Sequence, residues 1–191
     1  MNADELRAVQ APLKQLYRDQ PGAGRVTSRA EGTLDPDAIA IVVDAWHGKV
    51  TAGLHQAGGG SGELACSADM LLEALVGCAG VTLRAVATAM GVTIHGGKVI
   101  AEGVWDARGT LGVDRATPVG LTEIAVRFEV DCDADRAKLE RMIQTSNEQH
   151  TREMAALREE LRLQRSQPPV QASGGHSRDR RRCRECLLCS A

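Results

Sequence analysis

The sequence predicts an α+β protein, in which strands and helices occur in separate runs instead of alternating. Three strand-like runs precede residue 57 and two follow residue 92, and a long helical pattern comes after each group. The 191 residues are 43% apolar, which is enough to bury a core. Only Tyr17, Trp46, Trp105 and Phe128 are aromatic, so aliphatic side chains must build that core.

The first part of the chain begins with an amphipathic helix over residues 3–18, which the PGAG stretch at 21–24 ends. A flexible glycine-rich loop is expected at residues 57–64. This loop lacks the Lys-Ser/Thr ending and the glycine spacing of phosphate-binding loops, which disfavours that role. Between the helix and the loop, alternating or continuous apolar residues predict strands at 25–34, 38–46 and 48–54.

The strongest helical pattern covers residues 67–90, with Ser67 as the expected N-cap and Gly91 at the end. Most of its faces are apolar or small, so the helix should be central and buried, with a partner subunit packed on it. One continuous face, expected to point inward, contains Leu71, Leu75, Cys78, Thr82, Val86 and Ala89.

Two long strands are expected after this helix, at residues 93–109 and 120–132. Asp133 or Asp135 then caps a second long helix, which the pattern extends to about residue 165. The domain organisation predicted from these elements is an N-terminal helix at 1–22, a main domain at 23–165 and a disordered tail at 166–191 that is rich in Arg and Cys.

Charge is distributed unevenly, although the formal net charge is only −2. Residues 1–150 contain 14 basic and 20 acidic side chains, whereas residues 151–191 contain 9 basic and 5 acidic ones. The scarcity of aromatic rings excludes a platform that stacks nucleic-acid bases. No uninterrupted apolar run approaches ~20 residues and no signal peptide is evident, so we expect a cytoplasmic protein that does not span a membrane.

Cys78 is the residue best placed for chemistry, because it lies between Gly77 and Gly80 in the middle of the central helix. Each glycine costs a helix interior roughly 1 kcal/mol relative to alanine. This cost indicates that another backbone or a ligand approaches the thiol closely. The alternative interpretation is an inert core cysteine, since free cysteines are among the most buried residues.

The stretch SADMLLEALVGCAGVTLRAVATAMGV around Cys78 resembles the OsmC/Ohr family of thiol-dependent peroxidases. The strand trio and glycine-rich loop before it, and the strands GGKVIAEGVWDARGTLG and GLTEIAVRFEVD after it, extend the resemblance over roughly residues 25–145. The resemblance implies an OsmC-like fold in which antiparallel sheets wrap paired central helices in an intertwined homodimer.

The resemblance also implies site residues. Cys78 falls on the family's peroxidatic cysteine, which attacks an organic hydroperoxide and uses a cellular dithiol as reductant, without a cofactor or metal. Asp69 falls where many members have an acidic residue that holds an arginine against the thiolate. The alternative for Asp69 is a first-turn carboxylate favoured by the helix dipole.

Two departures from the family pattern concern the arginine and a second cysteine. His55 lies near the expected arginine position and is the candidate cation or donor; a polar surface histidine is the alternative. Arg25 and Arg29 lie earlier and would act across the dimer. The family's resolving cysteine falls near residues 147–150, where His150 stands instead and no cysteine is present. A shifted reading frame or a divergent terminus after about residue 145 accounts for this.

The function expected from these residues is reduction of organic hydroperoxides through Cys78. The alternative is a non-catalytic OsmC-like dimer that binds a small hydrophobic ligand. Cys183, Cys186 and Cys189 have spacings that suit zinc or an iron–sulfur cluster, with His176 as a fourth ligand. A disordered tail without bound metal is the favoured interpretation of that segment.

Overall fold

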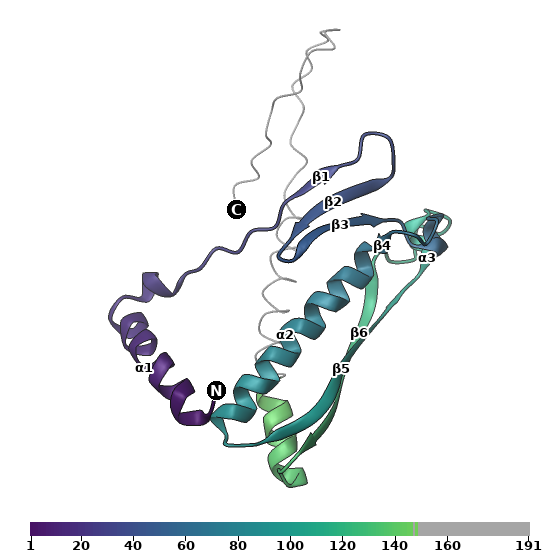
Figure 1. Ribbon diagram of the computed structural model, residues 1–191. Coiled ribbons are helices and arrows are strands. Elements are labelled where there is room, and N and C mark those ends of the chain that lie inside the picture. Colours follow the sequence, from purple (N-terminus) through teal and green to yellow (C-terminus); the bar gives the residue numbers. More distant parts are fainter. Residues whose placement is uncertain (147, 149–191) are drawn as a thin grey trace. The chain divides into compact units, whose positions relative to one another are not determined.

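The computed structural model describes residues 1–146 and 148 (Figure 1). Contacts divide the chain into two units, Met1–Glu153 and Met154–Ala191, and the second lies outside the described residues. The described residues also do not include His150, the tail cysteines or the expected continuation of the second helix to residue 165. The predicted domain boundaries stay predictions.

The N-terminal helix α1 spans Ala3–Asp19, as predicted from its amphipathic pattern. Asn2 and Glu5 form a capping box, in which the Glu5 backbone N–H donates to Asn2 Oδ1 at 2.9 Å. A short 3₁₀ turn, η1 at Pro21–Gly24, follows the helix. No residue of α1 is buried, so packing within this chain contributes little to its stability.

The strand trio forms most of a four-stranded sheet in the order β1-β2-β3-β4. Its strands are β1 Gly32–Leu34, β2 Ala40–Ala45, β3 Gly48–Gly53 and β4 Ala65–Cys66, with the short 3₁₀ turn η2 at Gln56–Gly58 between the last two. The first three pair antiparallel, and β4 pairs parallel to β3. The predicted strand at 25–34 is shorter than expected, because only residues 32–34 pair with β2.

The central helix α2 spans Ser67–Ala89, and Gly91 adopts a φ of +62° directly beyond its end. The helix is therefore confirmed, but Ser67 as its N-cap is wrong. Strand β4 runs directly into the helix, so Cys66 occupies the cap position and Ser67 is already helical. By length and composition alone α2 is also long and apolar enough to cross a membrane, a test that core helices pass as well.

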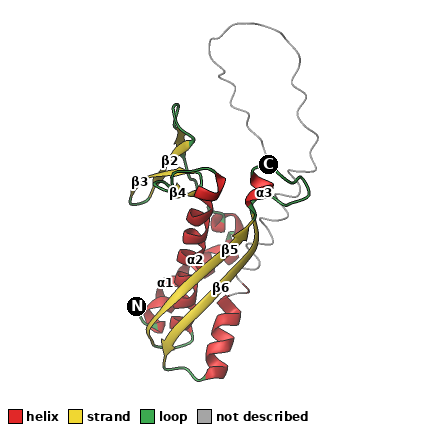
Figure 2. Ribbon diagram, turned by 90° about the vertical axis from the view of Figure 1, so that its right-hand side faces the viewer, coloured by secondary structure: helices red, strands yellow, loops and turns green. Residues whose placement is uncertain are grey.

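The two long strands form an antiparallel hairpin of β5 Ile94–Trp105 and β6 Leu121–Cys132 that lies along α2 (Figure 2). The predicted strand 93–109 ends early, because Asp106 caps the short helix α3 at Ala107–Thr110. The Arg108 N–H donates to Asp106 Oδ1 at 2.9 Å. The second helix begins at residue 136, and Asp135 is its cap, accepting from the Lys138 N–H at 2.7 Å.

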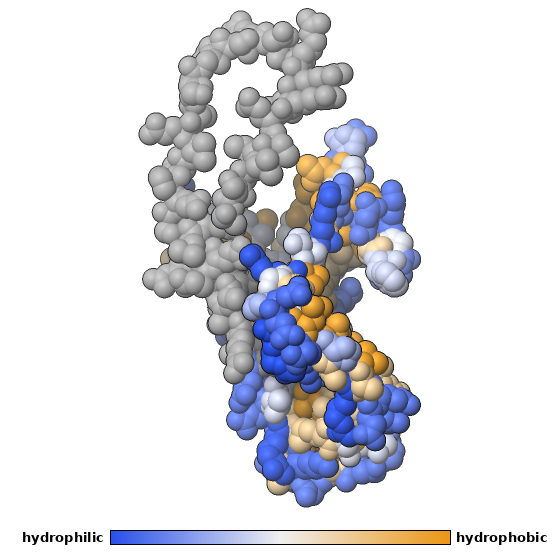
Figure 3. All heavy atoms as spheres, turned by 90° about the vertical axis from the view of Figure 1, so that its left-hand side faces the viewer, coloured by the Kyte–Doolittle hydropathy of each residue, from blue (hydrophilic) through white to orange (hydrophobic). Residues whose placement is uncertain are grey.

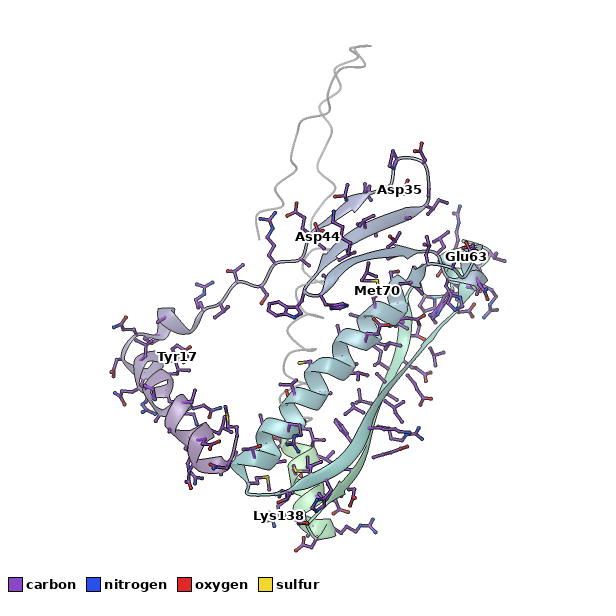
Figure 4. All side chains as sticks on the ribbon, in the orientation of Figure 1. Tyr17, Asp35, Asp44, Glu63, Met70 and Lys138 are labelled. Atoms are coloured by element: carbon purple, nitrogen blue, oxygen red, sulfur yellow. The ribbon has the colours of Figure 1, made fainter. Side chains whose placement is uncertain are left out.

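The core lies around the C-terminal half of α2. Leu83, Ala87, Val92 and Met142 are its buried members, and side chains of β5, β6 and the second helix pack around them. Lys138 lies in the first turn of the second helix. Figure 4 shows it near one end of α2, with Met70 at the other end. One side of α2 is therefore buried within the chain by β5, β6 and the second helix.

The described residues bury α2 on one side only, and the expectation that a partner subunit covers the rest stays a prediction. Leu71 is 58% exposed and Val81 is 73% exposed, although both belong to α2. Figure 3 shows apolar side chains at the surface on one face of the molecule. The described elements therefore cover only one side of the helix.

Candidate functional site

Cys78 lies in the middle of α2 and is exposed. Because residues advance by 100° around a helix, its neighbours on the same side are three or four residues away. We define the open face of α2 as its exposed residues Leu71, Ala74, Cys78, Val81 and Ala85. The candidate nucleophile is therefore surrounded by small and apolar side chains.

The prediction of which face of α2 points inward is wrong. The sequence placed Cys78 inside with Leu71 and Val86, whereas the buried residues of α2 are Ala79, Leu83 and Ala87. The hairpin and the second helix pack on that side, which leaves Cys78 facing outward. A cysteine sealed in the core of this chain, the alternative interpretation, is thereby excluded for the described structure.

The glycines beside Cys78 have different surroundings. A Cβ added at Gly80 would lie 3.7 Å from Val99 Cγ2, which is an ordinary van der Waals distance to a side chain of β5. The close backbone approach predicted from the two glycines is therefore not seen at Gly80 among the described residues. A Cβ at Gly77 would meet nothing within 4 Å. The space beside Gly77 is thus open to a molecule outside the described chain.

Asp69 lies in the first turn of α2 and is exposed. Nine residues separate it from Cys78, which places it about 13 Å away along the axis and on the opposite side of the helix. The structure therefore does not bring this carboxylate to Cys78 within one chain. A first-turn carboxylate that interacts favourably with the helix dipole fits this position.

His55 directly precedes η2, and its side chain contacts Ala57 and Trp105. Its Nδ1 accepts a hydrogen bond from the Ala57 N–H at 3.0 Å. Its ring meets Trp105 edge to face, with centroids 5.2 Å apart and planes at 87°. The imidazole thus joins the loop after β3 to the end of β5.

Arg25 and Arg29, the other two candidate cations, are exposed and lie far from Cys78 in the sequence. Arg29 pairs with Glu31 at 2.5 Å between Nη2 and Oε2. Cys66 is buried beneath the start of α2, and Cys132 is half-buried at the end of β6. Among residues 1–146 and 148, no group of three potential metal ligands occurs.

Shifted pKa values occur at the two ends of β5. At its start, Asp133 raises the pKa of His95 through a 2.5 Å hydrogen bond and its negative charge. The same contact, with help from the Thr93 hydroxyl, lowers the pKa of Asp133. Beyond its end, hydrogen bonds from Arg108 lower the pKa of Asp106. The His95–Asp133 contact joins the start of β5 to the end of β6, whereas the Asp106–Arg108 contact is local to the cap of α3. The first contact was not predictable from the sequence, because its partners lie 38 residues apart.

Arg84 is a residue that the sequence reasoning passed over. It is the one cation in residues 67–90, a fact that the sequence does display. Its Nη1 donates to the Ile94 carbonyl oxygen at 3.3 Å, where β5 begins. This contact places a guanidinium beside the crevice between α2 and β5.

Comparison with known proteins agrees with this fold. A family model described as OsmC-like protein matches residues 60–160, more than half of the chain, so the chain belongs to the OsmC-like family. The matched range includes α2 with Cys78 and the β5–β6 hairpin. Membership supports a peroxidase-like or stress-related role in general terms.

The solved structures similar to this chain include an OsmC-like protein from Mycoplasma pneumoniae, with 17% identity and a TM-score of 0.52. The match covers 63% of this chain and 80% of that one. A hypothetical protein from Aquifex aeolicus VF5 has 16% identity and a TM-score of 0.46, over 64% and 80% of the two chains. None of the curated proteins matches. The first similarity confirms the α+β, OsmC-like fold.

Proposed function

We propose that this protein reduces organic hydroperoxides at Cys78, with electrons from an external dithiol. The observation that supports it most is the exposed position of this thiol at the centre of the open face of α2. An apolar face around a cysteine suits a substrate with an organic tail. Family membership adds to this support, because it makes a peroxidase-like role the general expectation.

The first step oxidises Cys78 and reduces the peroxide. The thiolate sulfur attacks the terminal oxygen of the hydroperoxide, an S–O bond forms and the O–O bond breaks. The alkoxide leaves and takes up a proton as an alcohol, so thiol and hydroperoxide become sulfenic acid and alcohol. Sulfur loses two electrons and the peroxide gains them.

The second step regenerates the thiol. One sulfur of the external dithiol attacks the sulfenic acid, which releases water and forms a mixed disulfide. The other sulfur then attacks this disulfide, restores Cys78 and leaves the dithiol oxidised. A resolving cysteine within the chain is not needed for this route, which suits the sequence at residues 147–150.

The proposal includes a homodimer. Leu71 and Val81 of the open face are 58% and 73% exposed, and a second copy of the chain would cover these two side chains. The proposed dimer leaves Cys78 accessible to the hydroperoxide and the dithiol. Asp69 would then act from the partner subunit, because helix geometry places it on the side of α2 opposite to Cys78 of its own chain.

The test is consumption of cumene hydroperoxide by the reduced full chain in excess dithiol. We expect Cys78→Ser to lose the protein-dependent rate, because the nucleophilic sulfur is gone. Cys66→Ser and Cys132→Ser are matched controls and should keep it, since Cys66 is buried and Cys132 half-buried. Equal rates for the unchanged chain and Cys78→Ser would reject the catalytic proposal.

A second candidate function, binding of a small hydrophobic ligand without catalysis, is favoured by a separate feature. A crevice of about 360 Å³ beside β1 to β3 is lined by Leu34, Ala38, Ile39, Ile41 and Ala52. Ile39 is 77% exposed, so apolar surface is available there. Saturable binding of a neutral alkane-like probe at these residues, together with no peroxide turnover, would favour this function over the first.

A further inference from the structure

We propose that a cavity between α2 and β5 binds a small amphipathic carboxylate, with Arg84 holding the carboxylate group. The cavity has a volume of about 390 Å³, within the range of small-molecule sites. Its lining includes Gly80, Leu83 and Arg84 from α2 and Ile94, Gly97 and Val99 from β5.

Glycines on both walls create this cavity. Gly80 presents no side chain toward Val99, and Gly96 and Gly97 present none at the start of β5. Gly97 has a φ of +155°, and a Cβ there would lie 2.4 Å from the Glu129 carbonyl oxygen. The close approach of β6 therefore requires glycine at this position, and Gly97 contributes only backbone to the lining of the cavity.

The inner walls of the cavity are apolar. Leu83 is 4% exposed, and Ile94, Val99 and Val130 are half-buried around it. Ile94 and Val130 also pack against the buried core, which fixes these walls in place. A short hydrocarbon chain would find dispersion contacts there without displacing a polar group.

Arg84 supplies the polar end of the site. It uses one N–H for the Ile94 carbonyl oxygen, and a guanidinium has five such donors. No carboxylate of the described residues lies within ion-pair distance of it. A carboxylate matches the remaining planar donors in a two-point contact, which a neutral ligand cannot do.

The other charged groups near the cavity are only partly paired. His95 pairs with Asp133, and Asp131 on β6 adds negative charge beside His95. Lys98 also lines the cavity, and Glu129, opposite it in the strand register, forms an ion pair with Arg127 at 3.6 Å. The positive charges of Arg84 and Lys98 therefore favour an anion in the cavity, and Arg84 is the cation on the α2 wall.

This site is separate from Cys78. Gly80 is two residues further along α2, which turns it 200° around the axis relative to Cys78. The cavity thus lies on the side of the helix toward β5, whereas the open face points away. A carboxylate bound there is a ligand other than the hydroperoxide attacked by the thiol of the same chain.

The test uses the full chain and sodium octanoate, with binding followed by calorimetry. We expect saturable binding of one octanoate per chain and at least about a tenfold weaker Kd for Arg84→Gln. Arg115→Gln, the same charge change in an exposed loop, should bind as the unchanged chain does. The neutral probe 1-octanol should bind the unchanged chain and Arg84→Gln with the same affinity.

Two further measurements keep the proposal testable if Arg84→Gln folds poorly. Amide NMR shifts on adding octanoate should centre on Gly80, Gly96 and Gly97. Gly80→Met should weaken octanoate binding by filling the cavity, and the 3.7 Å space before Val99 accommodates its Cβ. Cys78→Ser should bind octanoate unchanged. Absence of saturable binding, an unchanged Kd in folded Arg84→Gln, or NMR shifts confined to other residues would overturn the site.

Discussion

The two sides of α2 differ in how the described residues cover them. On one side Ala79, Leu83 and Ala87 are buried by β5, β6 and the second helix. On the other side the open face contains equally apolar residues but remains exposed around Cys78. The comparison teaches that the described part of the chain packs against only one side of this helix, and that the candidate nucleophile lies on the other side.

The covered side should respond most strongly to loss of volume. We expect Leu83→Ala to lower the free energy of unfolding by about 2–5 kcal/mol, because Leu83 is 4% exposed within the core. Chemical denaturation measures this change at several protein concentrations. Val113→Ala, a 74% exposed loop valine, should change it by no more than about 0.5 kcal/mol. A loss as small for Leu83→Ala would show that this side is not packed.

The hairpin that covers this side depends on the close approach of its strands. We expect Gly97→Ala to destabilise the chain by about 1–3 kcal/mol, since φ is +155° and the new Cβ would meet the Glu129 carbonyl. Gly96→Ala is the matched control, because a Cβ there meets nothing within 4 Å. Equal denaturation midpoints for the two variants would contradict the strand geometry.

The open face should affect assembly instead of folding. We expect Val81→Glu to change the stability of the single chain by at most about 0.5 kcal/mol, because the side chain is 73% exposed. A buried charge would nevertheless disrupt the proposed dimer. Light scattering should give about two chain masses for the unchanged protein and 20.3 kDa for the variant. Val113→Glu should stay dimeric; a dimer that survives Val81→Glu would place the interface elsewhere.

The smallest effect is expected at the end of the hairpin, where His95 and Asp133 pair. The pKa of His95 is raised by folding, so its contribution to stability is full below about pH 6.5 and is lost as pH rises through the folded value. The pKa of Asp133 is lowered, so its contribution is present above about pH 3.8 and is lost on further acidification.

The pair therefore stabilises most between these two limits, and NMR titration measures it. In Asp133→Asn the pKa of His95 should fall toward its ordinary value. In Asp131→Asn it should fall less, because Asp131 acts only as the weakest of the raising charges. A His95 pKa that is unchanged by Asp133→Asn would mean that the pair does not form in solution.

The sequence predicted the elements better than their surroundings. Helix α2 was predictable from its apolar spacing and Gly91, and the hairpin from its alternating strands. Which side of α2 is buried was not predictable, because apolar residues occur all round the helix and periodicity then has no preferred face. Contacts such as His95 with Asp133, which lie 38 residues apart, follow only from strand pairing.

The sequence likewise predicted the central residue of the candidate site but not its surroundings. Cys78 was identified from its sequence context, but its exposure was not. Asp69 and His55 were placed near it by analogy of position, whereas helix geometry puts Asp69 on the opposite side and the His55 ring contacts Trp105. Arg84 was visible as the one cation in an apolar helix, yet its role depends on a cavity that only the packing of β5 reveals.

The most direct test of the central claim is to trap the oxidised thiol. One equivalent of cumene hydroperoxide is added to the reduced full chain in the presence of dimedone, without a dithiol, and the modified cysteine is identified by mass spectrometry. We expect one dimedone adduct per chain at Cys78 and none at Cys66 or Cys132, together with one equivalent of cumyl alcohol. Alcohol formed without an adduct at Cys78, or an adduct at Cys66 or Cys132 instead, would contradict the assignment of Cys78 as the peroxidatic thiol.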